Sequence, residues 1–337
     1  MLNKIYETIK KTLKDNYKEI IIFVITIFIA TYQLPFYIDA PGGLIDASKR
    51  VSIKDAPTKK GSFNMAYVSE IPATLPLLLV AQFNKKWDIL KKEEVILENE
   101  TKAESEERGK IYLQTTAANA VLYAYTRAGK EVSIKNNRVL LLYKFPEADT
   151  DLLIGDSITK INHIPVANVT DVGKVLETCD ANSRIIIEVI RKNKTYTRYA
   201  KLDKDKKIGV ILQPAFDIKS NPDCKFNFDS KESGPSGGLI TTLTIYNYLV
   251  KEDITNGLKI AGTGTIEPDG SVGEIGGIKY KLAGVVKKKA DLFFCPAGEN
   301  YNEAMKEKKK NKYKIKIIGV ETLDEALNYL KNYKKKD

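Results

Sequence analysis

A serine in a glycine-rich turn is the residue of this sequence whose surroundings best suit chemistry. Ser236 stands in the run Gly-Pro-Ser-Gly-Gly at residues 234–238, and apolar residues at helical spacing follow it. Ser236 is therefore expected at or just before a helix N-terminus, where unpaired main-chain N–H groups and the helix dipole favour an oxyanion. An ordinary N-cap serine has the same surroundings, so this segment alone leaves a nucleophile and a cap open.

A nucleophilic serine needs a base, and the composition restricts which residue can act as one. The 337 residues include a single histidine, His163, which is expected in a turn after a strand. A lysine can serve instead if burial lowers its pKa. Lys279 and Lys281 both flank the apolar stripe of a helix predicted after the Gly-Gly pair at 276–277. Periodicity does not choose between them, and a lysine whose ammonium reaches solvent would give the same pattern.

Other classes of site and partner are excluded by the composition. One histidine cannot supply a multi-histidine zinc site, and the three cysteines, Cys179, Cys224 and Cys295, lack CxxC spacing. The cysteines are expected to be small buried apolar residues, and no metal or cofactor is expected. The formal net charge is +11, yet only 7 of the 54 basic residues are arginines. This excess predicts lysine-rich solvated surfaces and no nucleic-acid partner.

Residues 20–38 contain no charged side chain and are predicted to form a transmembrane anchor. At about 1.5 Å per residue, a helix of this length spans about 28 Å, close to the thickness of a hydrocarbon core. The basic residues concentrate before the segment, which predicts a cytoplasmic region at 1–19 and a catalytic part outside the cell membrane. A cleaved signal peptide and a buried core helix are the alternatives, but no A-x-A-like site and no polar face are present.

The region between the anchor and the serine turn contains alternating strand and helix patterns. Residues 39–135 are predicted to be an extracytoplasmic α/β region, with a turn at residues 40–43, a strand at 63–68 and a helix at 115–128. The apolar run at residues 75–83 is too short to cross a membrane and contains a proline. It is therefore expected to be a soluble element.

Residues 136–205 resemble the PDZ domains of bacteria. The resemblance rests on the pattern Leu152-x-x-Gly155-Asp156-x-Ile158-x-x-Ile161-Asn162. It implies a β-rich unit in which a sheet edge beside a helix receives an extended peptide through main-chain hydrogen bonds. Asp151 stands where the family usually has glycine, and the sequence does not identify the carboxylate-binding loop.

Three ordered blocks within residues 206–337 resemble the peptidase domain of Lon-type proteases. The blocks are GPSGG at 234–238, GTGTI at 262–266 and GGIKYK at 276–281. The resemblance implies that Ser236 is the nucleophile and Lys281 the general base. It also implies that Thr263 bonds the lysine amine, while Gly237 shapes the turn and contributes to the oxyanion site. Gly237 replaces the usual alanine, and Thr265 stands where many members have glutamate.

The complete order of segments resembles that of bacterial membrane-anchored PDZ–Lon peptidases. No G-x-x-x-x-G-K-[ST] nucleotide motif occurs in the chain. The resemblance implies an α/β (α+β) fold with a transmembrane helix, an α/β region with an inserted PDZ-like unit, and a C-terminal Lon-type domain. It implies an ATP-independent serine endopeptidase that acts on peptides or unfolded protein segments, and a ring-shaped homo-oligomer. The alternative is a catalytically silent, membrane-tethered PDZ scaffold.

Overall fold

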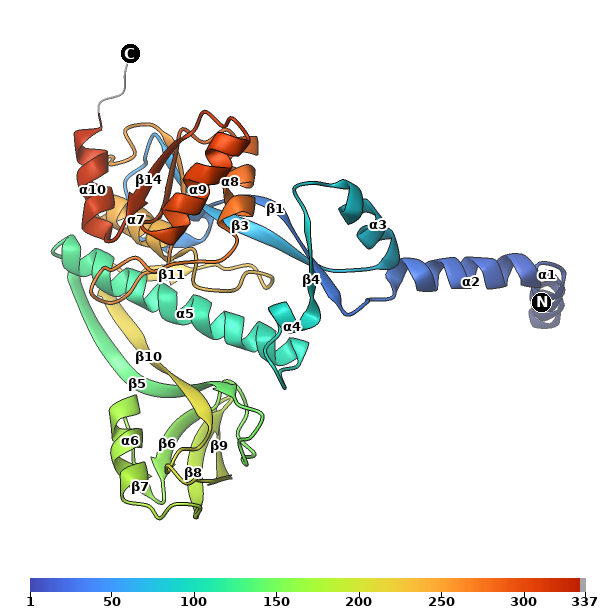
Figure 1. Ribbon diagram of the computed structural model, residues 1–337, viewed down its shortest axis with the longest axis horizontal. Coiled ribbons are helices and arrows are strands. Elements are labelled where there is room, and N and C mark those ends of the chain that lie inside the picture. Colours follow the sequence, from blue (N-terminus) through green and yellow to red (C-terminus); the bar gives the residue numbers. More distant parts are fainter. Residues whose placement is uncertain (334–337) are drawn as a thin grey trace. The chain divides into compact units, whose positions relative to one another are not determined.

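The computed structural model of the protein describes residues 1–333 and has a mixed α/β fold (Figure 1). The chain forms two compact units. The first unit combines Met1–Ala40 with Ser69–Val95, and the second combines Pro41–Val68 with the chain from Ile96 onward. Strands β1 (Phe36–Asp46) and β3 (Ser62–Pro72) each contribute residues to both units.

The first unit has a small core and a long helical N-terminal part. Its elements are α1 (Leu2–Asp15), α2 (Tyr17–Thr31), α3 (Leu75–Phe83), β4 (Asp88–Lys91) and α4 (Lys92–Val95). Strand β1 pairs with β4 in an antiparallel register that sets Phe36 opposite Lys91. Ile38, Ala73 and Ala81 are buried at the centre of this unit.

Helix α2 is shorter than the predicted segment at 20–38. It ends at Thr31, and strand β1 begins at Phe36, with Ile38 completely buried. Pro35 lies between the two elements and cannot continue a helix, because its nitrogen lacks a hydrogen-bond donor. The prediction of one helix over the whole segment is therefore wrong. Within residues 1–333, no helix combines the length and the apolar character that crossing a membrane requires.

The second unit contains a sheet between two helical layers. Its strands follow the order β14-β13-β12-β3-β1, and β12, β13 and β14 run parallel. The other helices and strands of this part are η1 (Ala47–Lys49), β2 (Val51–Ile53), β11 (Cys224–Phe226), α7 (Gly238–Leu249), β12 (Lys259–Gly262), α8 (Ile278–Lys287), β13 (Leu292–Pro296), α9 (Glu299–Lys310), β14 (Lys316–Val320) and α10 (Leu323–Asn332). Helices α5 (Lys102–Arg127), α7 and α10 share one apolar core, and α8 and α9 share another. Neighbouring residues of β13 alternate between these cores, since Phe294 faces the first and Phe293 the second.

The Gly-Gly run at residues 42–43 lies inside strand β1, so the predicted turn is wrong. An added Cβ at Gly42 would lie 2.2 Å from the main-chain oxygen of Tyr67 on β3. The glycine is therefore needed because the two strands approach closely, not because the chain reverses.

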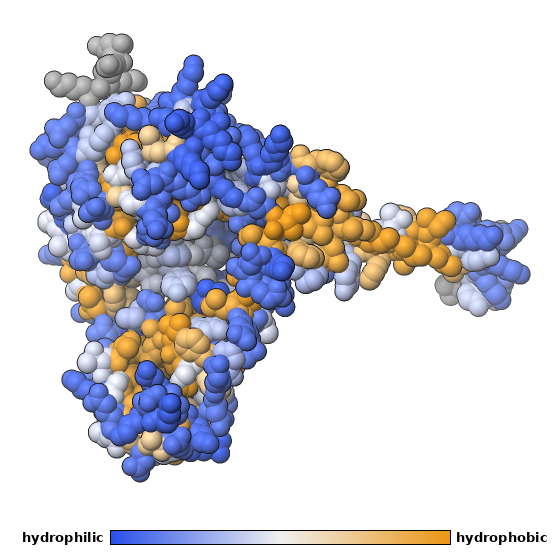
Figure 2. Space-filling view, in the orientation of Figure 1, coloured by the Kyte–Doolittle hydropathy of each residue, from blue (hydrophilic) through white to orange (hydrophobic). Residues whose placement is uncertain are grey.

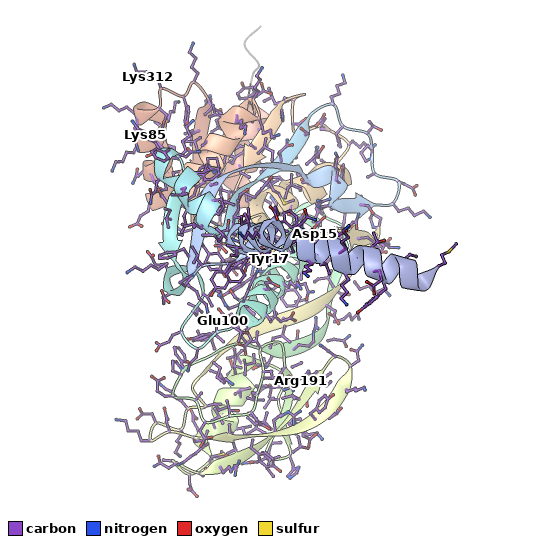
Figure 3. All side chains as sticks on the ribbon, turned by 90° about the vertical axis from the view of Figure 1, so that its right-hand side faces the viewer. Asp15, Tyr17, Lys85, Glu100, Arg191 and Lys312 are labelled. Atoms are coloured by element: carbon purple, nitrogen blue, oxygen red, sulfur yellow. The ribbon has the colours of Figure 1, made fainter. Side chains whose placement is uncertain are left out.

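A second sheet in this unit has the order β10-β5-β6-β8-β9, with β7 paired to β6. Its elements are β5 (Glu131–Lys144), β6 (Ser157–Ile161), β7 (Ile164–Pro165), α6 (Val169–Glu177), β8 (Arg184–Arg191), β9 (Lys194–Lys201) and β10 (Val210–Asn221). The Gly-Asp turn before β6 is held by a partly buried ion pair, in which Nε and Nη2 of Arg191 donate to the Asp156 carboxylate. Arg191 is labelled in Figure 3. His163 lies in the β6–β7 turn with its side chain largely exposed.

Candidate active site

Ser236 lies in the turn that leads into helix α7. Gly234 adopts a positive φ of 84°, and the Gly238 N–H donates to the Pro235 carbonyl to close the turn. Ser236 is half-buried. An added Cβ at Gly238 would lie 2.8 Å from the main-chain nitrogen of Ile266, so the start of α7 must be a glycine to fit against that segment.

Thr263 and Gly264, which follow strand β12, hold the main chain of Ser236 in place. The Gly264 N–H donates to the Ser236 carbonyl at 2.8 Å, and the Thr263 Oγ1 hydroxyl donates to the same carbonyl at 3.1 Å. The Leu239 N–H donates in turn to the Gly264 carbonyl at 3.0 Å. These bonds connect the second sequence block, at residues 262–266, to the first, at residues 234–238.

Lys281 lies on helix α8, and its side chain is directed to the same threonine. Its Nζ donates to Thr263 Oγ1 at 3.1 Å. Thr263 is completely buried and Lys281 is only 4% exposed. Burial lowers the pKa of the Lys281 ammonium to about 8, because the charged form loses hydration. Among residues 1–333, no hydrogen bond joins Lys281 Nζ to the Ser236 hydroxyl; Thr263 Oγ1 instead connects Nζ to the main-chain carbonyl of Ser236.

Lys279 lies two residues before Lys281 on the same helix and has different surroundings. It is half-buried, and its ammonium lies 4.8 Å from the centre of the Tyr280 ring. The two lysines therefore differ in burial and in contacts in the folded protein, although the periodicity of the sequence does not distinguish them. Gly237 is the N-cap of α7, and an added Cβ there would lie 2.7 Å from Met65 Sδ.

A cavity of about 410 Å³ opens beside Ser236. The residues that line it include the apolar Ile45, Met65 and Leu113 and charged residues of the loop before Ser236. In that loop, Glu232 accepts a hydrogen bond from Arg50 Nε at 2.6 Å. The Gly234 N–H donates to the Gly109 carbonyl of α5 at 2.8 Å. The sequence did not reveal Arg50, Met65 or Gly109 as neighbours of the site, because they lie more than a hundred residues from Ser236.

A larger cavity of about 800 Å³ lies in the PDZ-like sheet, away from Ser236. It runs between helix α6 and the start of β10, and its apolar wall includes Val172, Leu176 and Ile208. Gly209, with a φ of 77°, forms the bend that precedes β10. Within residues 1–333, β10 is the terminal strand of its sheet, so its outer edge can receive another strand.

Comparison with known protein families gives two matches that agree with this geometry. Residues 143–202 match the family model of the PDZ domain. Residues 229–332 match the family model of the Lon protease (S16) C-terminal proteolytic domain. A comparison with curated proteins found no match. The Lon-type match includes Ser236, Thr263 and Lys281, and it indicates a serine peptidase. The chain thus combines a PDZ domain with a Lon-type proteolytic domain, and the two matches together fit a serine peptidase of the PDZ–Lon type.

Proposed function

We propose that the protein is an ATP-independent serine endopeptidase in which Ser236 is the nucleophile and Lys281 the general base. The observation that carries this proposal is the buried Lys281, whose Nζ is joined to the main chain of Ser236 through one threonine hydroxyl. Burial accounts for its lowered pKa, so a useful fraction of the amine is neutral near pH 8.

The proposed reaction has two half-reactions. Neutral Lys281 takes the proton of the Ser236 hydroxyl while Oγ attacks the peptide carbonyl, and the protonated lysine then gives this proton to the departing amine. A water molecule hydrolyses the resulting ester with Lys281 again as base. The Gly238 N–H is already bonded to Pro235, so stabilisation of the oxyanion falls to the N–H groups of Ser236 and Gly237.

The substrates we propose are peptides and unfolded protein segments. The sequence has no P-loop motif with which the chain could couple ATP hydrolysis to unfolding. The groove between α6 and β10 supports capture of an extended substrate, since an edge strand offers main-chain hydrogen bonds. The Gly209 bend and the nearby Lys207 favour a C-terminal carboxylate at one end of this groove.

We further propose that helix α2 attaches the protein to a cell membrane and that the catalytic domain is extracytoplasmic. None of the residues of α2 is buried, although nearly all from Ile20 to Thr31 are apolar. Lysines concentrate in α1, which favours the cytoplasmic side for the N-terminus. Accessibility of the C-terminal domain to protease in cells with an opened envelope tests the orientation, and full protection would contradict it.

The decisive test of the enzyme is cleavage of casein and of a fluorogenic peptide by the wild type, Ser236→Ala and Lys281→Ala. We expect both variants to lose at least about 1,000-fold in kcat, since each removes one half of a cooperating pair. Lys279→Ala is the matched control and should keep most of the activity. Equal turnover in all four proteins would instead support the silent PDZ scaffold.

A further inference from the structure

Helix α3 in the first unit has two apolar faces. One face, which includes Leu77, Leu78 and Ala81, packs into the core of that unit. The opposite face is exposed to an unusual degree: Leu75 is 46%, Leu79 53%, Val80 55% and Phe83 87% exposed. A surface helix normally presents polar residues on its outer face, and here Gln82 is the only polar side chain in the helix. This apolar stripe therefore requires a covering partner.

The stripe adjoins a second exposed apolar surface of the same unit. Helices α2 and α3 are in contact, and the Leu34 N–H after α2 donates to the Ala73 carbonyl just before α3 at 2.8 Å. Figure 2 shows apolar residues gathered over both helices, whereas polar residues cover α1. A partner that covers α2 is thus positioned to cover α3 as well.

The chain that follows α3 has the residue types of a membrane interface. Lys85, labelled in Figure 3, and Lys86 are exposed, and the half-buried Trp87 comes directly after them in the sequence. Lysines at the edge of an apolar helix reach anionic head groups, and tryptophan prefers the boundary between head groups and acyl chains.

We infer that α3 is a second membrane-contacting element, whose exposed stripe lies among the acyl chains of an anionic bilayer while Lys85 and Lys86 contact lipid phosphates. This inference rests on the proposed attachment through α2. A second copy of the chain is the less favourable partner, because a symmetric contact through α3 would place Lys85 and Lys86 of one copy near the same lysines of the other. An anionic bilayer supplies both the apolar cover and the countercharge.

The sequence provides its own probe, because Trp87 is the only tryptophan in the chain. The full-length protein is reconstituted into vesicles of phosphatidylglycerol and phosphatidylcholine with bromine atoms at shallow or at deep acyl positions. We expect loss of Trp87 emission, greater with shallow bromine, and less loss when phosphatidylglycerol is omitted. The double variant Leu79→Lys/Phe83→Lys should recover the emission seen in non-brominated vesicles. Ile190→Lys, an equivalent change at a 41% exposed position in the PDZ domain, is the matched control and should leave quenching unchanged.

Flotation and peptide cleavage, measured on the same samples, separate the outcomes. Wild-type protein that floats with the vesicles but shows no quenching would overturn the role of α3 and leave attachment through α2 intact. Protein that does not float would overturn both membrane proposals, whereas cleavage of a soluble peptide would still support the enzyme. A wild-type dimer that becomes monomeric in the double variant, without quenching, would assign the stripe to a second copy of the chain and contradict the inference.

Discussion

At the scale of single residues, the properties of Lys281 follow from its burial on helix α8 and from its hydrogen bond to Thr263. Its Nζ is buried and has one hydroxyl as its acceptor, so the protein stabilises the neutral amine relative to the charged form. The same burial favours the proposed role of Lys281 as a base and lowers the stability of the folded protein. Each has a measurable consequence.

Peptide cleavage should depend on pH through the Lys281 amine. With a pKa of about 8, about one tenth of the lysine is neutral at pH 7 and about half at pH 8. We therefore expect kcat/KM for a fluorogenic peptide to rise about tenfold for each pH unit below 8 and to level off above it. The Ser236→Ala protein provides the background rate. A flat profile between pH 6 and 9 would contradict the assignment of Lys281 as the base.

Replacement of Lys281 by methionine should stabilise the folded protein at pH 7. The pKa of Lys281 falls from 10.5 unfolded to about 8 folded, so the charged form disfavours folding by about 3 kcal/mol. This penalty is complete below pH 8 and disappears as the pH rises toward 10.5. Calorimetry should give Lys281→Met a higher Tm than the wild type at pH 7, with the gap closing toward pH 10. A lower Tm at pH 7 would show that the Thr263 hydrogen bond outweighs the cost of burial.

At the scale of elements, the site depends on close backbone contacts among strands β1 and β3 and helix α8. Gly42 of β1 lies against Tyr67 of β3, and an added Cβ at Gly284 of α8 would lie 3.3 Å from the main chain of Gly42. Helix α8 carries Lys281, so the position of the lysine depends on two glycines that have no chemical role. No side chain larger than hydrogen fits between these backbones without displacement.

Gly42→Ala should therefore lower both stability and activity. The new methyl group would meet the Tyr67 carbonyl at 2.2 Å, and relieving this contact should cost about 1–3 kcal/mol and shift α8. Gly43→Ala is the matched control, since its Cβ would meet only the ends of the Tyr67 and Lys288 side chains, at 3.2 and 3.5 Å. We expect a lower Tm and slower peptide cleavage for Gly42→Ala, and values close to those of the wild type for Gly43→Ala. Equal Tm values would contradict this packing argument.

At the scale of the whole molecule, one chain carries the proposed site of cleavage and a separate groove in which we propose that extended peptides bind. The PDZ groove is about twice the volume of the cavity beside Ser236, and the two share no lining residue. Such an arrangement can raise the effective concentration of a long substrate at the active site without changing the chemistry. The ring-shaped oligomer implied by the family resemblance stays a prediction.

A side chain that obstructs the PDZ groove should impair the cleavage of long substrates but not that of short peptides. Gly173 lines it, and an added Cβ there would contact no other atom within 4 Å, so Gly173→Leu places a side chain in the groove without strain. We expect a raised KM for casein and an unchanged kcat/KM for a short fluorogenic peptide. Lys174→Leu, the neighbouring exposed position that does not line the groove, is the control. Parallel losses on both substrates would indicate that the PDZ domain is not a capture site.

Much of this architecture could be predicted from local patterns. The helix after Ser236, the helix that carries both lysines and the hairpin of β8 and β9 all follow from periodicity and turn residues, because such signals act over a few residues. The strand through Gly42 and Gly43 could not be predicted in this way. Gly42 is needed because strand β3 approaches closely, which the local sequence does not reveal. The end of α2 at Thr31 was likewise missed, because apolar residues continue beyond it into a buried strand.

The sequence by itself determined which chemistry is available: a serine on a glycine turn, one histidine, and a lysine as the alternative base. Residue types and short spacings suffice for this, because they are properties of the covalent chain. Only the tertiary structure decided which of Lys279 and Lys281 is buried beside Thr263, where the PDZ groove lies, and which face of α3 is exposed. Burial, and with it the pKa of a lysine or the fate of an apolar stripe, depends on segments far apart in the chain that meet only when it folds.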